Sequence, residues 1–339
     1  MSLNLPRIIG NAVSVANSWL DRRALHHPRY FKTLASLGAL WFASHLVQAT
    51  SHLIAPHVLP SRLGKLKRNA GAWAIVTGAS DGIGKGFAFE LAAQGFNVVL
   101  IARNRAKLES VAAELRGEFP QAQTKIWVAD AAEVTAEGRV DFAQLKKLVA
   151  GTPVTILINN VGIANNPLEL DILPDKDIVD VVVVNDIFTT LITKHVLPTL
   201  EANGPGLILN VGAFADRLAI PYMGVYSGSK GYTTSWTRGL AAELRERKSK
   251  VQVQALLVNA VNSQSNHTPV GLITPSARSF ARSALRLAST QVVIAPTFWH
   301  KISSGILLVL PECFSRPMVS AFANQMRENF RQGKKLGQS

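Results

Sequence analysis

Tyr226 and Lys230 have the types and spacing needed for proton transfer. They lie four positions apart in "YSGSK", and residues at i and i+4 share one face of a helix. A free phenol, with a pKa of about 10, is a weak acid-base partner near neutral pH. An adjacent ammonium group, together with the charge of a bound nicotinamide ring, favours the phenolate and brings the hydroxyl into a useful range. The pair therefore predicts a proton donor for ketone reduction, and the alternative is an ordinary amphipathic helix start.

A glycine-rich turn, "VTGASDGIGKG", lies far upstream, between a short apolar segment and a helical pattern. Glycines let the backbone turn tightly and approach a pyrophosphate, and the helix N-terminus supplies free N–H groups. A glycine turn alone is weak evidence, but the strand before it and the helix after it strengthen the prediction. A dinucleotide site is therefore predicted, and its candidate residues are Gly78, Ser80, Asp81, Gly82, Ile83 and Gly84.

Basic residues follow the second apolar segment, where an acidic residue would bind the ribose hydroxyls of NAD. Arg103 occupies this place, with Arg105 and Lys107 close behind. A cation here suits the 2′-phosphate of NADP. Because basic residues at a helix start oppose the helix dipole, an anionic ligand explains them better than an ordinary basic helix start does. The sequence thus favours NADPH, with Arg103 and Lys107 as phosphate ligands.

The elements that must position these residues alternate between strand and helix. Apolar runs predict strands over 73–78, 97–103, 124–130, 154–162, 206–212 and 251–261. Helical patterns fall between them, over 85–95, 105–119, 142–150, 177–200 and 226–247. Such alternation requires a parallel sheet covered on both faces. The expected fold class is α/β, a Rossmann-like doubly wound parallel sheet.

Four motifs together resemble the short-chain dehydrogenase/reductase family over roughly residues 70–265. They are Thr77-Gly78-x-x-x-Gly82-x-Gly84, Asn159-Asn160-Val161-Gly162, Asn185 and Tyr226-x-x-x-Lys230. The glycine turn, "NNVG", "YSGSK" and two apolar segments outside this region resemble more narrowly the fungal very-long-chain 3-oxoacyl-CoA reductases, which are NADPH enzymes of the endoplasmic reticulum. The resemblance implies that Tyr226, Lys230 and Asn185 are catalytic. It also implies that Asn160 and Asp130 belong to the cofactor site, and that the substrate is a long-chain 3-oxoacyl-CoA or a related ketone reduced in a specialised pathway.

Two features depart from the family around the substrate. Ala213, thirteen residues before Tyr226, replaces the family's serine, which donates a hydrogen bond to the substrate oxygen. Loss of one such donor costs about 10²–10³ in rate, unless another group such as Asp216 or Tyr222 serves. The loop after the sixth strand is also unusual, with Asn259, Asn262 and Asn266. Two alternatives therefore stay open: an NADP-binding pseudoenzyme that acts as a scaffold in an elongation-type membrane complex, and a hydroxysteroid-type dehydrogenase.

The N-terminal part of the chain has a candidate membrane segment. Residues 34–55 contain no Asp, Glu, Lys or Arg, which is long enough to cross a hydrocarbon core of roughly 30 Å. His45, Gln48 and His52 weaken the signal, and the alternative is an amphipathic helix on a membrane or on the protein. The Lys and Arg residues on the two sides of this segment balance, so they do not indicate its orientation. The orientation is instead inferred from the expected cofactor, which is found in the cytosol. The expectation is an endoplasmic reticulum membrane protein with its catalytic domain facing the cytosol.

Three regions are expected: a segment with the transmembrane helix (1–60), the catalytic domain (70–290), and an apolar extension with a polar tail (291–339). Within the extension, the apolar stretch 302–322 is too interrupted to span a membrane. It fits a buried helix, a re-entrant hairpin or an acyl-chain contact.

Composition limits the partners. The 339 residues carry a formal charge of +14, which favours anionic partners such as cofactor phosphates, CoA or lipid head groups. No run of Lys and Arg with interleaved aromatics is present, so no nucleic acid partner is expected. The single cysteine, Cys313, excludes an intramolecular disulfide and a cysteine-based metal site, and no metal is predicted. A homo-oligomer or an elongation-type complex remains open.

Overall fold

The computed structural model describes residues 28–58, 62–67, 71–134, 140–218, 220–263, 266–288 and 290–333. The chain clusters into two compact units, Met1–Val58 and Leu59–Ser339. The described part of the first unit is one helix, α2 (Pro28–Val58). The second unit carries every residue predicted for the active site.

The second unit is built on a seven-stranded parallel sheet with the order β3-β2-β1-β4-β5-β6-β7. Its strands are β1 (Trp73–Thr77), β2 (Asn97–Ala102), β3 (Thr124–Val128), β4 (Val154–Asn159), β5 (Gly206–Val211), β6 (Val251–Leu256) and β7 (Val293–Ile294). Six of these were predicted from the sequence. The seventh, β7, has only two residues and therefore no apolar pattern to reveal it. The Rossmann-like fold class is confirmed.

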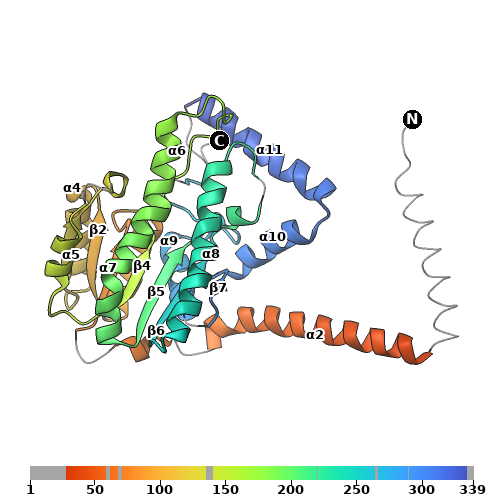
Figure 1. The fold of residues 1–339 in the computed structure, drawn as a ribbon, viewed down its shortest axis with the longest axis horizontal. Coiled ribbons are helices and arrows are strands. Elements are labelled where there is room, and N and C mark those ends of the chain that lie inside the picture. Colours follow the sequence, from red (N-terminus) through yellow and green to blue (C-terminus); the bar gives the residue numbers. More distant parts are fainter. Residues whose placement is uncertain are drawn as a thin grey trace. The chain divides into compact units, whose positions relative to one another are not determined.

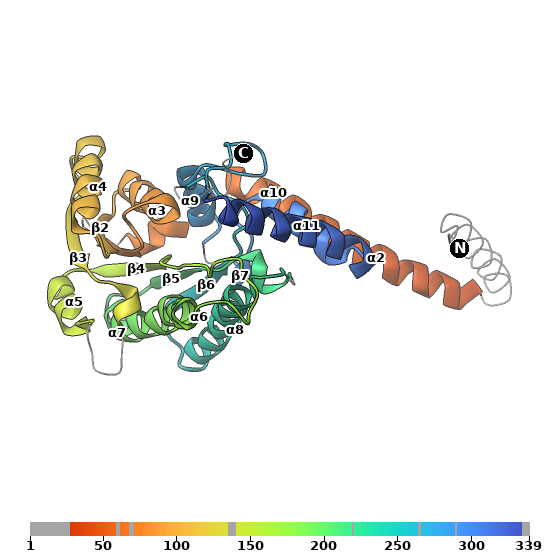
Figure 2. The same cartoon turned by 90° about the horizontal axis from the view of Figure 1, so that it is seen from above.

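Helices cover both faces of the sheet (Figures 1 and 2). Figure 2 shows one layer made of α3 (Gly82–Ala93), α4 (Arg105–Glu118) and α9 (Ala277–Arg286). The opposite layer is made of α5 (Phe142–Val149), α6 (Asp175–Val182), α7 (Phe188–Asn203) and α8 (Gly224–Glu246). Short helical turns are η1 (Arg62–Leu66), η2 (Ala131–Glu133), η3 (Val183–Ile187) and η4 (Phe214–Asp216), and two further helices, α10 (Phe298–Val309) and α11 (Glu312–Arg331), follow β7.

The two helix layers explain why the central strands are mostly apolar and buried along their whole length. Every residue of β1, β2, β4 and β5 is buried. A parallel sheet covered on both faces reads as continuous apolar runs and not as an alternating pattern. One large core cluster joins these strands to the α5–α7–α8 layer through side chains such as Ile75, Leu157, Phe188 and Ile192. This core fixes the strand ends, and with them the site.

The cofactor and substrate residues meet where the strand order reverses. β1 pairs with β2 on one side and with β4 on the other. The chain therefore leaves β1 and β4 in opposite directions and opens a crevice at their carboxyl ends, which is the usual ligand site in such sheets. The glycine turn follows β1 and Asn160 follows β4, so both motifs lie at this crevice.

The helix predicted over 177–200 is a continuous run from Asp175 to Asn203, interrupted by the π-helical turn η3. Among the described residues, this run is the one helix long and apolar enough to cross a membrane by length and composition. Half of its apolar window is buried within the protein, as in a core helix that packs on a sheet.

The predicted transmembrane segment 34–55 lies inside α2. The large apolar side chains described along it are exposed: Leu34, Leu37, Leu40, Trp41, Phe42, Leu46 and Val47. Helix formation there is confirmed. Insertion in a membrane stays a prediction, and residues 1–27 of the expected N-terminal segment lie outside the described residues.

The C-terminal region is helical and belongs to the compact unit Leu59–Ser339. The apolar stretch 302–322 includes the end of α10 and the first half of α11, with Leu310 and Pro311 between them. The boundary expected near residue 291 stays a prediction. The last six residues of the predicted polar tail, 334–339, lie outside the described part.

Candidate active site

The glycine turn between β1 and α3 packs closely on its neighbours only because its glycines lack side chains. Gly78 and Gly82 have φ values of +63° and +52°, the left-handed region that glycine enters without strain. A Cβ atom on Gly84 would lie 2.2 Å from the carbonyl oxygen of Gly78 and 2.6 Å from Nδ2 of Asn160. The turn is thus folded tightly onto the end of β4, and the free N-terminus of α3 opens beside it.

Thr77 and Asn160 hold this turn against β4. The Thr77 hydroxyl accepts hydrogen bonds from the backbone N–H groups of Asn160 (2.8 Å) and Val161 (3.0 Å), and donates to the carbonyl of Ile158 (3.2 Å). Nδ2 of Asn160 donates to the Thr77 carbonyl at 3.0 Å. This arrangement agrees with the role expected of Asn160, which is to shape the cofactor pocket.

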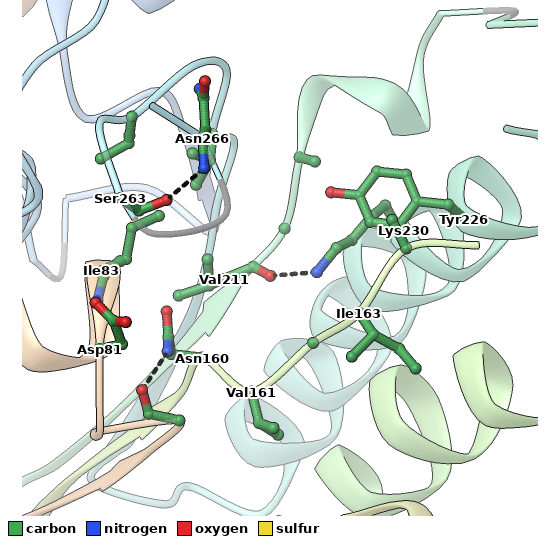
Figure 3. A pocket seen from close by; sticks show the side chains of 18 of the residues that line it. Asp81, Ile83, Asn160, Val161, Ile163, Val211, Tyr226, Lys230, Ser263 and Asn266 are labelled. Atoms are coloured by element: carbon green, nitrogen blue, oxygen red, sulfur yellow. Dashed lines mark hydrogen bonds between the residues drawn. The ribbon is translucent and has the colours of Figure 1, made fainter. Parts of the chain in front are cut away.

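A cavity of about 430 Å³ opens at this junction. Of the predicted cofactor residues, Gly78, Asp81, Gly82, Ile83, Asn160, Tyr226 and Lys230 line it (Figure 3). Ser80 belongs to the same turn, and Gly84 is buried beneath it. Asp81 caps α3 by accepting a hydrogen bond from the Gly82 N–H. A cavity lined by a tight glycine turn and a helix N-terminus fits a dinucleotide pyrophosphate.

Arg103 and Asp130 lie at a separate cavity of about 370 Å³, beyond the ends of β2 and β3. Arg103 is exposed there, and Asp130 caps η2 through the Ala132 N–H at 3.0 Å. Lys107 is exposed in the first turn of α4 and is not among the residues that line this cavity. Its backbone N–H is capped by Asn104. Arg103 is therefore better placed for an anionic group than Lys107.

Tyr226 and Lys230 enter the first cavity from α8, one turn apart (Figure 3). Nζ of Lys230 donates to the Val211 carbonyl at 3.0 Å and lies 5.7 Å from the centre of the Tyr226 ring. Tyr226 is held at its backbone, where its N–H donates to Oδ1 of Asn165 at 3.1 Å. The fold thus brings the predicted pair together on one helix face.

Asn185 lies in the π-helical turn η3, and such turns often occur at functional sites. Its Oδ1 accepts from the Ile163 N–H at 2.8 Å, and its Nδ2 donates to the Ile163 carbonyl and to the Ser229 hydroxyl, both at 2.9 Å. A Cβ atom on Gly162 would lie 3.2 Å from Oδ1 of Asn185 and 3.4 Å from Nζ of Lys230. Asn185 therefore joins η3, the loop after β4 and α8 beside the lysine.

Burial governs the ionisation of this pair in the protein alone. Part of Tyr226 reaches the cavity, yet burial raises the pKa of its hydroxyl to about 12. Burial lowers the pKa of Lys230 to about 8, and the nearby Asp186 carboxylate opposes that shift. In the protein without cofactor, desolvation thus outweighs the acidifying effect expected of the ammonium group, and Tyr226 is a fully protonated phenol near neutral pH.

Asp186 is a site residue that the sequence analysis did not identify. It follows Asn185 in η3, is 8% exposed, and its charge acts on Lys230. Burial raises its pKa from 3.8 to about 7. A carboxyl next to a predicted catalytic asparagine was a visible signal, but only the fold shows that it is buried near Lys230.

Ala213 follows β5 and lines the cavity together with Tyr226. The two replacement donors considered for it are engaged elsewhere. Asp216 accepts a hydrogen bond from Thr234 at 2.8 Å, and the Tyr222 hydroxyl accepts one from Arg327 at 3.4 Å. Neither is among the residues that line the cavity. Asn259 and Asn266 do line it, whereas Asn262 lines a neighbouring one.

A second, mostly apolar cavity of about 360 Å³ lies on the other side of Tyr226. It shares Ala213, Tyr226, Val258 and Asn259 with the first cavity. The remaining lining comes from the segment after β5 and from α11: Phe214, Ala215, Leu218, Ile220, Met318, Val319 and Phe322. An acyl-chain contact was one of the interpretations of residues 302–322 in the sequence. Only the fold shows that α11 and Tyr226 line the same cavity.

Known proteins resemble the chain over most of its length. A family model for short chain dehydrogenase matches residues 72–269. A very-long-chain 3-oxoacyl-CoA reductase from Podospora anserina is 37% identical over 75% of this chain and 74% of its own. The corresponding protein from Aspergillus clavatus is 33% identical over 87% of this chain and 85% of its own.

Solved structures support the fold. L-Sorbose reductase from Gluconobacter frateurii, in complex with NADPH and L-sorbose, is 20% identical and aligns with a TM-score of 0.58 over 68% of this chain and 97% of its own. At this identity the likeness concerns the fold alone. The family model and the sequence identities lead to a firmer conclusion: the chain belongs to the short chain dehydrogenase family and is a nicotinamide-dependent oxidoreductase.

Proposed function

We propose that this protein uses NADPH to reduce the 3-oxo group of a long-chain acyl-CoA to a 3-hydroxyacyl-CoA. One observation carries the proposal: Tyr226 stands at the junction of a cavity suited to a dinucleotide and a cavity suited to an acyl chain. The relatives from Podospora anserina and Aspergillus clavatus, both named very-long-chain 3-oxoacyl-CoA reductase, support the same substrate class.

Each residue has a role in this reaction that follows from its place. The bound cofactor would supply the hydride. Tyr226, protonated near neutral pH because burial raises its pKa to about 12, donates a proton to the substrate oxygen. Lys230, fixed by the Val211 carbonyl, supplies a positive charge beside the phenolate that remains. Asn185 holds the loop after β4 against α8.

The choice of NADPH over NADH depends on Arg103. It lines the cavity at the ends of β2 and β3 and is exposed, so its guanidinium is available to a 2′-phosphate. Guanidinium–phosphate contacts are charge-assisted and specific. Asp130 lines the same cavity as a further cofactor residue, and Lys107 is the weaker candidate.

An NADPH-binding scaffold without turnover is the second candidate, and Ala213 is the observation that favours it. Its side chain offers no hydrogen-bond donor at a position that lines both cavities together with Tyr226. Loss of one such donor costs about 10²–10³ in rate, which slows an enzyme without excluding catalysis. The reductase is preferred because Tyr226, Lys230 and Asn185 remain assembled.

We also propose that α2 anchors the protein in the endoplasmic reticulum membrane, with residues 59–339 on the cytosolic side. The exposed apolar side chains along α2 support this proposal, as does the water-insoluble acyl chain of the proposed substrate. In this arrangement 1–60 is the anchor segment, 70–290 the catalytic region and 291–339 the C-terminal extension. Assembly as a homo-oligomer or in an elongation-type complex is part of the same hypothesis.

The test is NADPH oxidation by the full chain in detergent with a long-chain 3-oxoacyl-CoA. Tyr226→Phe should abolish turnover while NADPH binding persists, because the fold of the cradle does not depend on the hydroxyl. Tyr232→Phe is the matched control, since Tyr232 lies on the same helix and its hydroxyl contacts only Thr190 among the described hydrogen bonds. Ala213→Ser should raise turnover.

The outcomes separate the two candidates. Native turnover that is lost in Tyr226→Phe and kept in Tyr232→Phe supports the reductase. NADPH binding without turnover in the native chain, unchanged in Ala213→Ser, would favour the scaffold.

A further inference from the structure

The helix α11 is the wall of the apolar cavity that faces Tyr226. Met318, Val319 and Phe322 contribute its lining, and Met318 and Phe322 are also more than half exposed. The cavity therefore opens outward along α11, and its inner end is at Tyr226. A long apolar chain that enters along this helix would present its end to the phenol.

A polar cluster holds the following turn of α11 in place. Val319, Ala323 and Arg327 recur every four residues and so lie on one face of the helix, and Ala323 is only 1% exposed. The Arg327 guanidinium forms an ion pair with Glu169, and its centre lies 4.7 Å from the centre of the Tyr222 ring. Its Nη1 also donates to the Tyr222 hydroxyl at 3.4 Å.

The ion pair of Arg327 and Glu169 is made through Nη2 and Oε1. Nε of Arg327 and Oε2 of Glu169 are both buried without a hydrogen-bond partner among the described residues, so they are the donor and acceptor that a second bond of this pair would use. Arginine is favoured where a planar carboxylate is bound through two parallel hydrogen bonds. The Arg327 side chain is 19% exposed, so solvent screens the pair less than it screens a surface pair.

The cluster is linked to the catalytic tyrosine through Asn165. Nδ2 of Asn165 donates to the Tyr222 carbonyl at 2.9 Å, and its Oδ1 accepts from the Tyr226 N–H at 3.1 Å. Tyr222 has a φ value of +65°, a left-handed conformation that is uncommon for an aromatic residue and persists only where the surroundings hold it. Contacts to Arg327 and Asn165 from two sides provide such surroundings.

We propose that Arg327 is a positioning residue that fixes α11 as the wall of the substrate pocket and so makes the protein prefer long acyl chains over short ones. This inference rests on the proposed acyl-CoA substrate. A short acyl group ends near Tyr226 and does not reach Met318 or Phe322, whereas a long chain is buried against them. Each methylene so buried increases affinity about fourfold. Released from its cluster, α11 would no longer supply that surface.

The experiment measures binding separately from turnover. The full chain, loaded with NADPH in detergent at a fixed micelle concentration, is titrated with palmitoyl-CoA and with acetyl-CoA. We expect Arg327→Ala to weaken palmitoyl-CoA binding ~tenfold or more, a change of about 1.4 kcal/mol, and to leave acetyl-CoA and NADPH binding within about twofold. Arg316→Ala is the matched control, because Arg316 lies on α11 and forms an exposed pair with Glu312.

A charge-exchange variant distinguishes loss of the ion pair from misfolding. The double variant Glu169→Arg with Arg327→Glu should recover most of the palmitoyl-CoA affinity that Arg327→Ala loses. Equal weakening for both acyl-CoAs, no weakening in Arg327→Ala, or a well-folded exchange variant without recovery would each overturn the inference.

The same titrations also distinguish this inference from the proposed function. If the native chain binds palmitoyl-CoA in preference to acetyl-CoA but does not oxidise NADPH with 3-oxoacyl-CoAs, the reductase proposal fails and the role of Arg327 stands. If the native chain shows no such preference, the role of Arg327 fails whatever the turnover.

Discussion

Asp186 should make this protein less stable as the pH rises, and Asp186→Asn should relieve that effect. The carboxylate is 8% exposed, and its Oδ1 has no hydrogen-bond partner among the described residues. Burial raises its pKa from 3.8 to about 7, although the Lys230 charge opposes the shift. The folded state therefore holds a proton on Asp186 at pH values where the unfolded chain has released it.

The sign and size follow from this difference in proton binding. Between about pH 4 and pH 7 the folded state binds more protons, so the free energy of unfolding falls as the pH rises through that window. A shift of about three pKa units corresponds to ~4 kcal/mol as an upper bound above pH 7. Asparagine removes the charge but leaves a buried amide, and Lys230 loses its counter-charge. We therefore expect a net gain of ~2 kcal/mol at pH 8 and almost none near pH 4.

The assay is urea or thermal unfolding of the native chain and of Asp186→Asn at pH 5 and pH 8. For a unit of this size, each kcal/mol shifts the Tm by roughly 2–4 °C. Asp180→Asn is the control, since its pair with Lys176 is at the surface and is worth less than about 1 kcal/mol. A variant less stable than the native chain at pH 8, or an equal effect at both pH values, would refute this reasoning.

Three further predictions concern the cofactor side of the site. Gly84→Ala should destabilise the protein by ~3 kcal/mol, because the new Cβ atom would lie 2.2 Å from the Gly78 carbonyl oxygen. Gly117→Ala is the control and should be neutral or stabilising, since open space surrounds its Cβ position. Equal Tm values for the two variants would contradict this. Arg103→Ala should raise the Kd for NADPH ~tenfold and leave the Kd for NADH unchanged. Arg105→Ala should change neither Kd, because the ion pair of Arg105 with Glu109 is exposed. Fluorescence titration with each nucleotide measures these Kd values. Thr77→Val should lower the free energy of unfolding in urea by about 2 kcal/mol or more, because two backbone N–H groups lose their acceptor. An unchanged urea midpoint of unfolding would refute this prediction.

Local signals made much of the fold and of the cofactor site predictable. The strands β1, β2, β4 and β5 are continuous apolar runs because both faces of the sheet are covered. The glycine turn could be found because its backbone conformation requires glycine. In contrast, β7 pairs with β6 only through Val293 and Ile294. Two residues are too few to show an apolar pattern, so this strand was not predicted.

The substrate side depended on contacts between distant segments. The cluster of Arg327, Glu169 and Tyr222 joins three parts of the chain that no spacing rule relates. The hydrogen-bond partners of the two groups considered as replacement donors for Ala213 also come from distant segments, since Asp216 accepts from Thr234 and the Tyr222 hydroxyl accepts from Arg327. The burial that raises the pKa of Tyr226 in the protein alone also comes from distant segments, and local spacing does not reveal it.

The sequence by itself determined six of the seven strands, the glycine turn and the pairing of Tyr226 with Lys230, because each is marked by residues close together in the chain. Only the tertiary structure decided that Asp186 is buried near Lys230 and that α11 closes a second cavity at Tyr226. Desolvation and cavity walls arise from the sum of surrounding atoms, and those atoms come from segments far apart in the chain.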